Sequence, residues 1–343
     1  MSQNHLSKSL QTPLLAPKFS GTRISSVESL SFVLKTPIDE LVSIADTSES
    51  YYRIHKEIEK PDGSIRKIYS VREPLKGIQR KINSLILKKC KYPEYLTGSL
   101  PNCTHIKNIN FHVGQKTIIS IDATNFFPSI NASDVMNLWA EFFNFESQTS
   151  TLLTQLCSFQ GGLAQGAPTS SYISNLVFWD VEPLIVQEFH RKGYIYSRYV
   201  DDICISKSSR TTKEEKTWAI KTAQKVFISK GLSIKSRKTK IMEKGSRQEV
   251  NKKTIHNGKV NASKADKDKI RAEIHNLKIR IDKNLLPDIP YEKRYLSIRG
   301  KILYLEKFNK TAAQKLQNQL DELVAYIKSK GVIWRSPKNK YIP

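Results

Sequence analysis

Two adjacent aspartates, Asp201 and Asp202, lie between two short apolar, β-branched runs of this chain. The first run ends at Tyr199-Val200 and the second begins at Ile203, so the pattern predicts a β-hairpin with the acids at or near its tip. Two like charges side by side in such a setting are unfavourable unless something neutralises them. A divalent cation does so, and Mg²⁺ characteristically takes one or two carboxylates plus substrate phosphates. An acidic turn on a solvated hairpin is the alternative interpretation.

A third carboxylate follows another apolar run. Residues 117–121 are apolar and β-branched, which predicts a buried strand that ends at Asp122. An isolated acid there would be costly, whereas a neighbouring strand that ends in Asp201 and Asp202 would bring three carboxylates together. Three acids around two Mg²⁺ ions suit in-line phosphoryl or nucleotidyl displacement. The alternative for Asp122 alone is a helix-capping or turn acid.

These two segments resemble the A and C motifs of reverse transcriptases, whose catalytic turn reads Tyr-x-Asp-Asp. Between them lies Gln165-Gly166-Ala167-Pro168-Thr169-Ser170, which resembles the family's B motif, Q-G-x-P-x-S. A Gly/Pro/Ser cluster alone predicts only a loop. All three motifs in the expected order make the resemblance specific, and it covers roughly residues 40–325.

The resemblance implies an α+β right-hand polymerase with fingers, an antiparallel-sheet palm and a helical thumb. The length allows two or three such subdomains around a substantial core. We expect an N-terminal arm and helices in 1–50, fingers in 51–116 with 131–164, palm in 117–130 and 165–262, and a helical thumb with a basic tail in 263–343. Apolar periodicity predicts helices over 25–50, 75–87, 131–158, 172–191 and 211–230.

The resemblance also implies roles for single residues. The three aspartates would be catalytic, and with the backbone carbonyl of Ala123 they would ligate two Mg²⁺ ions, Mn²⁺ being the alternative metal. Phe127 matches the aromatic steric gate that excludes a ribose 2′-hydroxyl, which implies deoxynucleotide substrates. The segment Gln165-Gly166-Ala167 would line the nucleotide and template pocket, where glycine lets backbone approach a ligand closely. Lys238, in a stretch similar to the D motif, would neutralise or protonate the pyrophosphate leaving group.

A basic hairpin precedes motif A. Residues 51–58 and 65–71 are strand-like, and Pro61-Asp62-Gly63-Ser64 between them is a turn signal. This hairpin is similar to the fingers hairpin of reverse transcriptases, whose basic side chains hold the incoming triphosphate. Arg66 is the first candidate for that contact and Lys67 the second. A solvated basic edge strand is the alternative.

The charge balance points to a polyanionic partner. The chain has 343 residues, with 56 Lys or Arg against 32 Asp or Glu and a net charge of +24. Binding should therefore depend strongly on salt. No apolar stretch reaches ~18 residues and the N-terminus lacks the apolar run of a signal peptide, so we expect neither membrane association nor export. Four scattered cysteines without a C-x-x-C pair argue against zinc and for a reducing, cytoplasmic location.

Much of this charge lies toward the C-terminus. Residues 231–280 hold fifteen Lys or Arg and five Asp or Glu. A helix is predicted after a capping box at Ser263 and Asp266, with its apolar stripe at Ile270, Ile274, Leu277 and Ile281. The residues that we assign to RNA binding are Lys264, Lys267, Arg271 and Lys278 on this helix, and Arg299 in an Arg-Gly element that resembles one in bacterial reverse transcriptase thumbs. A merely solubilising face is the alternative.

The size and details point to bacterial retron reverse transcriptases and their antiviral relatives. Asn108 and His112 match the N-A-x-x-H element of retron enzymes, although Ile109 replaces its alanine. Val250-Asn251-Lys252 stands where Val-Thr-Gly is usual, and Val200 where bacterial enzymes usually have alanine. These departures leave open a strict retron enzyme or a defence-associated one with a different RNA.

The sequence therefore predicts an RNA-directed DNA polymerase that makes cDNA from a structured noncoding RNA, which is both template and partner. An RNA–DNA duplex and dNTPs are further ligands, and an effector protein of a defence operon is a further candidate partner. Two alternatives stay open, namely untemplated or protein-primed DNA synthesis by an Abi-like enzyme and a catalytically idle RNA-binding scaffold. An RNA-dependent RNA polymerase is disfavoured by Phe127 and by Gln165-Gly166.

Overall fold

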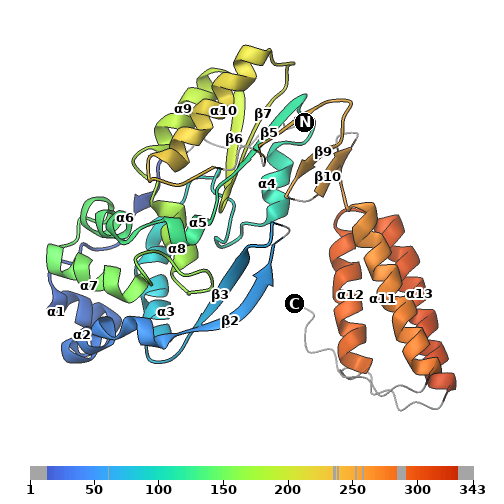
Figure 1. Cartoon of the computed structure of the whole chain (residues 1–343), viewed down its shortest axis with the longest axis horizontal. Coiled ribbons are helices and arrows are strands. Elements are labelled where there is room, and N and C mark those ends of the chain that lie inside the picture. The colour runs from blue at the N-terminus through green and yellow to red at the C-terminus, as the bar shows by residue number, and fades with distance from the viewer. Residues whose placement is uncertain are drawn as a thin grey trace, which may run out of the picture. The chain divides into compact units, whose positions relative to one another are not determined.

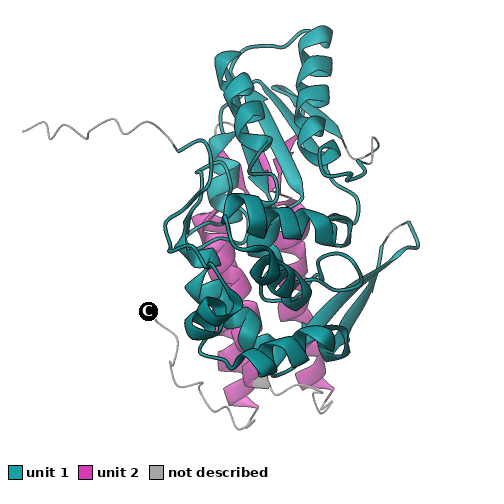
Figure 2. Ribbon diagram, turned by 90° about the vertical axis from the view of Figure 1, so that its left-hand side faces the viewer, with its two compact units in different colours: residues 1–246 teal, residues 247–343 magenta. Residues whose placement is uncertain are grey.

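The chain folds into two compact units, residues 1–246 and 247–343, each with its own hydrophobic core (Figure 2). The computed structural model describes residues 14–60, 62–234, 237, 239–251, 253–256, 259–283 and 291–330. Lys238 and the basic C-terminal tail lie outside these residues. Within the described ranges, no helix combines the length and the apolar character that crossing a bilayer requires.

The first unit begins with a docked segment and short helices. Strand β1 (Lys18–Phe19) pairs antiparallel with β4 (Cys90–Lys91), which anchors part of the expected N-terminal arm. The helical elements of this region are α1 (Val27–Leu34), α2 (Ile38–Asp46), η1 (Ser48–Tyr51), α3 (Leu75–Leu85) and η2 (Leu87–Lys89). The helices expected over 25–50 and 75–87 are thus present.

The basic hairpin forms as predicted. Strands β2 (Tyr52–Glu59) and β3 (Ile65–Val71) pair antiparallel, and Glu59 lies opposite Ile65 next to the turn. The backbone N–H of Tyr69 on β3 donates to the carbonyl of Gln165 at 2.8 Å, so the hairpin is tied to the motif B loop.

The centre of the first unit is a four-stranded sheet with strand order β6-β7-β5-β8 (Figure 1). Its strands are β5 (Thr117–Asp122), β6 (Tyr194–Tyr199), β7 (Asp202–Lys207) and β8 (Lys240–Glu243). Every neighbouring pair is antiparallel, as expected for a polymerase palm. The two central strands, β5 and β7, are rich in isoleucine, and Ile119, Ile121, Ile203 and Ile205 are buried at 0–1% exposure.

Helices cover this sheet on both faces. Helix α9 (Glu182–Arg191) packs on β6, α10 (Lys213–Ile228) packs on β5, and α4 (His105–Phe111) contacts β6. The side chain of Arg198 bonds to α9, whereas that of its neighbour Ser197 bonds to His112 at the end of α4. Because successive strand residues point to opposite faces, α9 and α4 lie on opposite sides of the sheet.

The prediction of one helix over 172–191 is wrong, because the structure has two helices there. The structure has α8 (Ser170–Leu176) and then α9, because Pro183 lies in the first turn of α9. Proline lacks the N–H that a continuous helix needs and disfavours helical backbone at the residue before it. The other helices between motifs A and B are α5 (Phe126–Ser129), α6 (Ala132–Asn137), the π-helical η3 (Leu138–Phe142) and α7 (Ser147–Cys157).

The second unit combines a small sheet with a helical bundle. Strands β9 (Gln248–Val250), β10 (Lys253–His256) and β11 (Lys259–Asn261) form an antiparallel sheet in the order β11-β10-β9. Helices α11 (Lys264–Asp282), α12 (Tyr291–Glu306) and α13 (Lys310–Ser329) follow. The capping box at Ser263 and Asp266 is present, and the predicted stripe of α11 is buried against α13, as a helical thumb requires.

Candidate active site

The acidic hairpin has a two-residue loop. Tyr199 and Asp202 are register partners on β6 and β7, which leaves Val200 and Asp201 at the tip. Val200 has φ 61°, whereas the φ of Asp201 is not positive. This is the φ pattern of a type II′ turn, which prefers glycine at its first position. A β-branched residue there is strained by roughly 1–3 kcal/mol, which persists only where the surroundings hold the turn.

The structure brings the two predicted strand ends together. Asp122 and Asp202 lie directly opposite each other on β5 and β7. The N–H of Ala123 donates to the backbone carbonyl of Asp201 at 3.1 Å. The hydroxyl of Ser120 donates to Oδ1 of Asp202 at 2.9 Å, which fixes one oxygen of that carboxylate. The acidic turn is therefore joined to the end of β5 by backbone pairing and by a side chain.

The electrostatics of this cluster favour a cation. Burial, and after it the negative charges of Asp201 and Asp122, raise the pKa of Asp202 to about 7. The hydrogen bond from Ser120 and the charge of Lys240 oppose this rise. A positive ion beside the cluster would favour the ionised carboxylate again.

The donor set fits a hard divalent ion whose coordination the substrate completes. In the ranges that the structure describes, no three His, Cys, Asp or Glu side chains are gathered closely enough to hold a metal on their own. Mg²⁺ keeps several waters and binds through one or two carboxylates plus substrate phosphates, so a preformed protein cage is not required. The oxygen atoms at hand come from Asp122, Asp201, Asp202 and the carbonyl of Ala123, a set that suits Mg²⁺ or Mn²⁺.

The motif B glycine is required by a close approach of protein backbone. Gly166 has φ 109°, and a Cβ at this position would lie 2.2 Å from the carbonyl oxygen of Tyr69. Its neighbour Gln165 accepts the hydrogen bond from the N–H of the same tyrosine, and Ala167 is buried. In the structure, glycine is needed here because the backbone of β3 comes close. From the sequence we had instead expected the close approach of a ligand.

The two phenylalanines after motif A have different surroundings. Phe126 is buried and stacks on Phe178, and its ring lies edge-on to that of Phe227. Phe127 is only half-buried, with its ring centroid 5.5 Å from that of Phe126. Phe126 is therefore a core residue, whereas Phe127 keeps an accessible side chain.

Two of the candidate triphosphate contacts belong to strand β3 of the basic hairpin. Arg66 and Lys67 are exposed on β3, with Lys67 opposite Glu57. Lys238 lies outside the described residues, so its role at the leaving group stays a prediction. Ser233, at the start of the D-like stretch, lies beside motif A. Its carbonyl accepts a hydrogen bond from the N–H of Thr124 at 2.8 Å.

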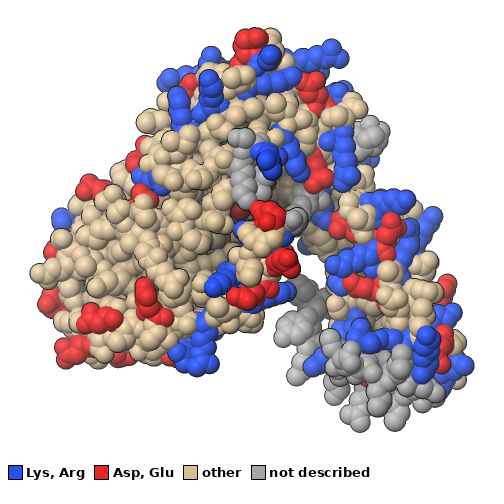
Figure 3. All heavy atoms as spheres, in the orientation of Figure 1, with Lys and Arg blue, Asp and Glu red and all other residues tan. Residues whose placement is uncertain are grey.

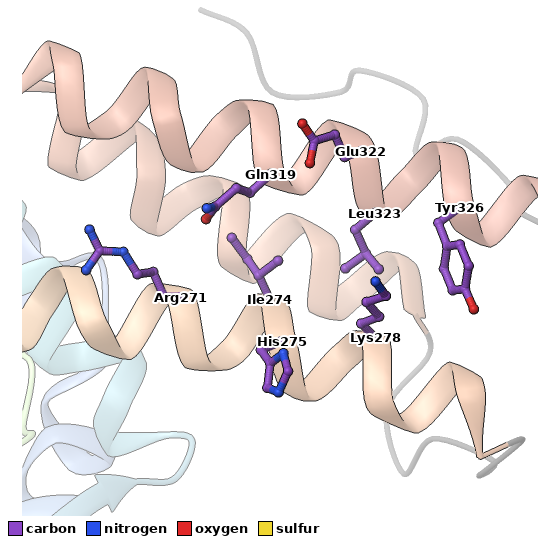
Figure 4. Close-up of a pocket in the computed structure, with 8 residues that line it drawn as sticks. All are labelled: Arg271, Ile274, His275, Lys278, Gln319, Glu322, Leu323 and Tyr326. Atoms are coloured by element: carbon purple, nitrogen blue, oxygen red, sulfur yellow. The ribbon is translucent and has the colours of Figure 1, made fainter.

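The predicted RNA-binding residues lie in the second unit. Lys264, Arg271 and Lys278 are exposed on α11, whereas Lys267 and Arg299 are half-buried. Arg271 and Lys278 line a groove of about 350 Å³ between α11 and α13 (Figure 4). Its other lining residues are Ile274, His275, Gln319, Glu322, Leu323 and Tyr326. This groove contains none of the three aspartates, so it is a candidate binding surface and not a reaction centre.

Sequence reasoning missed the groups that hold the acidic turn. Arg198 is fully buried and pairs with Glu182, Nε to Oε1 at 2.7 Å. A Cβ on Gly98 would lie 2.5 Å from the N atom of Val200, so the segment around this glycine packs directly on the turn. An arginine inside an apolar strand run was the available signal, because a buried charge requires a partner.

The role of His112 in the sheet was also missed, although the residue matched a family element. Its ring is fully buried, with Nδ1 2.7 Å from the hydroxyl of Ser206 and Nε2 2.7 Å from that of Ser197. Burial lowers the pKa of His112 to about 3, so the ring is neutral, with one nitrogen donating and the other accepting. The histidine thus links β6 to β7 from the α4 side.

Comparison with known proteins agrees with these motifs. The family model described as "Reverse transcriptase (RNA-dependent DNA polymerase)" matches residues 58–277. The Retron Se72 reverse transcriptase of Salmonella heidelberg (strain 579083-10) is 36% identical over 228 residues, which cover 66% of this chain and 59% of that protein. The chain thus spans less than two thirds of that relative. The Retron Ec48 reverse transcriptase of Escherichia coli is 30% identical over 319 residues, 89% of this chain and 77% of that protein.

Among solved structures, a foamy viral protease-reverse transcriptase in complex with double-stranded DNA aligns with a TM-score of 0.43 and 16% identity. That alignment covers 93% of this chain and 51% of the other. The family match and the Ec48 relative each cover more than half of the chain and include all three motifs. The chain belongs to the reverse transcriptase family, whose members generally use divalent metals, and it is a retron-type member of that family.

Proposed function

We propose that this protein is an RNA-directed DNA polymerase of a retron system, which extends a primer 3′-hydroxyl with deoxynucleotides and copies a structured noncoding RNA. The observation that carries the proposal is the direct pairing of Asp122 with Asp202 beside the Asp201 turn, in a chain of the retron reverse transcriptase type. The same relatives favour templated synthesis over the untemplated and idle-scaffold alternatives.

The three aspartates and the carbonyl of Ala123 would hold the metal ions. When bound, two Mg²⁺ ions activate the attacking oxygen and stabilise the leaving pyrophosphate. The protein's own contribution is to fix the carboxylates before substrate arrives. Ser120 holds one oxygen of Asp202, and the N–H of Ala123 holds the backbone of Asp201. Little reorganisation then remains for the reaction itself.

Other side chains would hold the substrates. Phe127 would lie against the deoxyribose, Arg66, Lys67 and Lys238 would contact the triphosphate, and Gln165-Gly166-Ala167 would border the nascent base pair. Exposed Lys and Arg of α11 would contact the RNA and the RNA–DNA duplex, since phosphate neutralisation dominates such affinity. All four cysteines are free thiols, which supports a cytoplasmic location.

Primer extension with a paired variant tests the carboxylates. The double variant Asp201→Ala with Asp202→Ala should incorporate no dNTP on an RNA template with Mg²⁺, while the wild type extends the primer. The matched control is Asp39→Ala with Glu40→Ala, an adjacent exposed acidic pair on α2, which should extend like the wild type. Equal DNA synthesis by the Asp201/Asp202 variant would refute the metal assignment.

Sequencing of the products and of the copurifying nucleic acid tests the template. We expect cDNA complementary to an RNA that copurifies with the protein. Products unrelated to any bound RNA would instead support untemplated or protein-primed synthesis. A wild type with no Mg²⁺-dependent dNTP incorporation would support the RNA-binding scaffold.

A further inference from the structure

A buried ion pair lies directly beside the catalytic turn. Arg198, on β6, is 0% exposed, and Glu182, at the start of α9, is 2% exposed. Nε of the arginine donates to Oε1 of Glu182 at 2.7 Å and Nη2 donates to Oε2 at 2.8 Å. This two-point contact between a planar guanidinium and a carboxylate fixes the orientation of the arginine. Tyr196 donates its hydroxyl to the same Oε1 at 2.7 Å.

The remaining donors of the guanidinium reach three backbone carbonyls. Nη1 donates to Val200 at 3.1 Å and to Ser174 at 3.4 Å, and Nη2 donates to Asn175 at 3.1 Å. Val200 is the first residue of the catalytic turn. Ser174 and Asn175 lie in the last turn of α8, the helix after motif B, where carbonyls have no partner within the helix. One side chain, oriented by α9, thus joins α8 to the turn.

The segment before α4 closes on the same turn through backbone contacts. The N–H of Arg198 donates to Tyr95 at 2.8 Å, and the N–H of Thr97 donates to the carbonyl of Arg198 at 2.9 Å. The side-chain amide of Asn175 donates to the carbonyl of Gly98 at 2.8 Å. The side of the turn that faces away from β5 is therefore contacted by Arg198, by α8 through this arginine, and by the segment around Gly98.

We propose that Arg198 is a positioning residue for nucleotidyl transfer, which holds the Asp201–Asp202 turn in fixed geometry relative to α8 and the motif B loop. The inference rests on the proposed polymerase function. A buried ion pair is weak evidence for stability, because apolar residues of similar volume often stabilise as well. The contacts to Val200, Ser174 and Asn175 instead secure relative placement, and a misplacement of ~1 Å at a reaction centre can lower a rate ~100-fold.

Two variants separate this role from folding. Arg198→Lys keeps the positive charge beside Glu182 but cannot make a two-point contact and also reach three carbonyls. Arg198→Met combined with Glu182→Gln removes both charges, so that neither is left uncompensated, and keeps an oxygen that accepts from Tyr196. Two controls match them. Arg80→Lys changes an exposed arginine 3.6 Å from Glu73, and Ile185→Val weakens packing on α9 without touching the arginine.

The measurements are kcat and KM for single dNTP incorporation, primer–template affinity by fluorescence anisotropy, and the thermal unfolding midpoint. At a temperature where every variant is folded, both Arg198 variants should lose ~10–100-fold in kcat, with less than ~3-fold change in KM. Primer–template affinity should stay at the wild-type value, and both controls should keep wild-type kcat.

A wild-type kcat in folded Arg198→Lys would overturn the inference. So would a loss of kcat in the Arg198 variants no larger than that of Ile185→Val for the same decrease in thermal unfolding midpoint. Failure of the proposed function looks different, because then the wild type itself incorporates no dNTP, and the inference falls with it.

Discussion

At the residue scale, burial shifts two titratable groups of the central sheet toward their neutral forms. Asp202, which accepts from Ser120, has its pKa raised to about 7 by burial. His112, between Ser197 and Ser206, has its pKa lowered to about 3 by burial. An acid and a base shifted in this way affect folding stability with opposite signs, in pH ranges that overlap. Single variants are therefore needed to separate the two.

For Asp202, stability without metal should fall as pH rises. Its pKa of about 7 in the folded protein exceeds the ordinary value of 3.8. Between these values the folded state binds more protons than the unfolded state, so the free energy of unfolding decreases from about pH 4 to pH 7. Asp202→Asn should remove this decrease, which we expect to be on the order of 1–3 kcal/mol. Urea unfolding in EDTA at pH 5 and pH 8 measures it, and parallel curves for both proteins would contradict the shift.

For His112 the sign is reversed. A pKa of about 3, below the ordinary 6.5, means that the folded state binds fewer protons in that range. The stabilising contribution is complete above pH 6.5 and is lost as pH falls toward 3. His112→Gln should have a lower free energy of unfolding than the wild type at pH 7.5. On acidification its free energy of unfolding should fall less steeply than that of the wild type, the difference in slope being up to about 1.4 kcal/mol per pH unit. The comparison uses denaturant midpoints from pH 7.5 to 4.5, and an unchanged slope in the variant would show that His112 does not titrate as expected.

The accessible ring of Phe127 should determine sugar selectivity. Phe127→Ala removes the aromatic group that would lie against the 2′ position, so the variant should incorporate ribonucleotides. We expect the ratio of kcat/KM for dNTP over NTP to fall by about 10–100-fold. Phe126→Leu is the matched control, since this neighbour is a core residue and its change should leave selectivity intact. Unchanged selectivity in Phe127→Ala would exclude the gate role.

At the element scale, the sequence predicted the strands and hairpins better than the helix packing and side-chain contacts that hold them in place. β5, β6 and β7 follow from local apolar runs and from the turn between them, because period and turn residues are local properties. The bond between Arg198 and Glu182 depends instead on where α9 packs, which no local pattern contains. From the sequence we expected one helix over 172–191, although Pro183 lies within that segment. The helical apolar pattern is present both before and after the break, so periodicity alone did not reveal two helices.

The segment around Gly98 offers a test of how closely an element must approach the turn. A Cβ at this position would lie 2.5 Å from the N atom and 2.6 Å from Cγ2 of Val200, and the first of these is backbone that cannot rotate away. Gly98→Ala should therefore displace the turn and lower kcat by about 10-fold or more. Gly77→Ala in α3 is the control, because its new methyl group would meet only the flexible end of Glu73. Full activity in folded Gly98→Ala would show that the turn tolerates the shift.

At the scale of the whole molecule, charge is unevenly divided between the two units. Residues 247–343 hold 23 Lys or Arg and 10 Asp or Glu, so a unit with less than a third of the chain carries +13 of the net +24. Figure 3 shows Lys and Arg gathered over the α11–α13 bundle and near α9 and α10, whereas the face over α6 and α7 has few charges. Composition alone predicted a polyanionic partner, but only the fold separates the exposed Lys264 from the half-buried Lys267 on the same helix.

This division predicts where the salt dependence of RNA binding originates. Each lysine or arginine that neutralises a phosphate contributes about 0.7–0.9 to the slope of log K against log salt concentration, because a counterion is released. Changing Lys264, Arg271 and Lys278 to Gln should therefore weaken binding and reduce that slope by about 2–3. The matched control changes Lys213, Lys221 and Lys225 of α10, which are equally exposed and lower the net charge equally. If both triple variants reduce the slope alike, overall charge governs binding and α11 does not contact the phosphates. If only the α11 variant does so, the contacts are local and the thumb helix holds the nucleic acid.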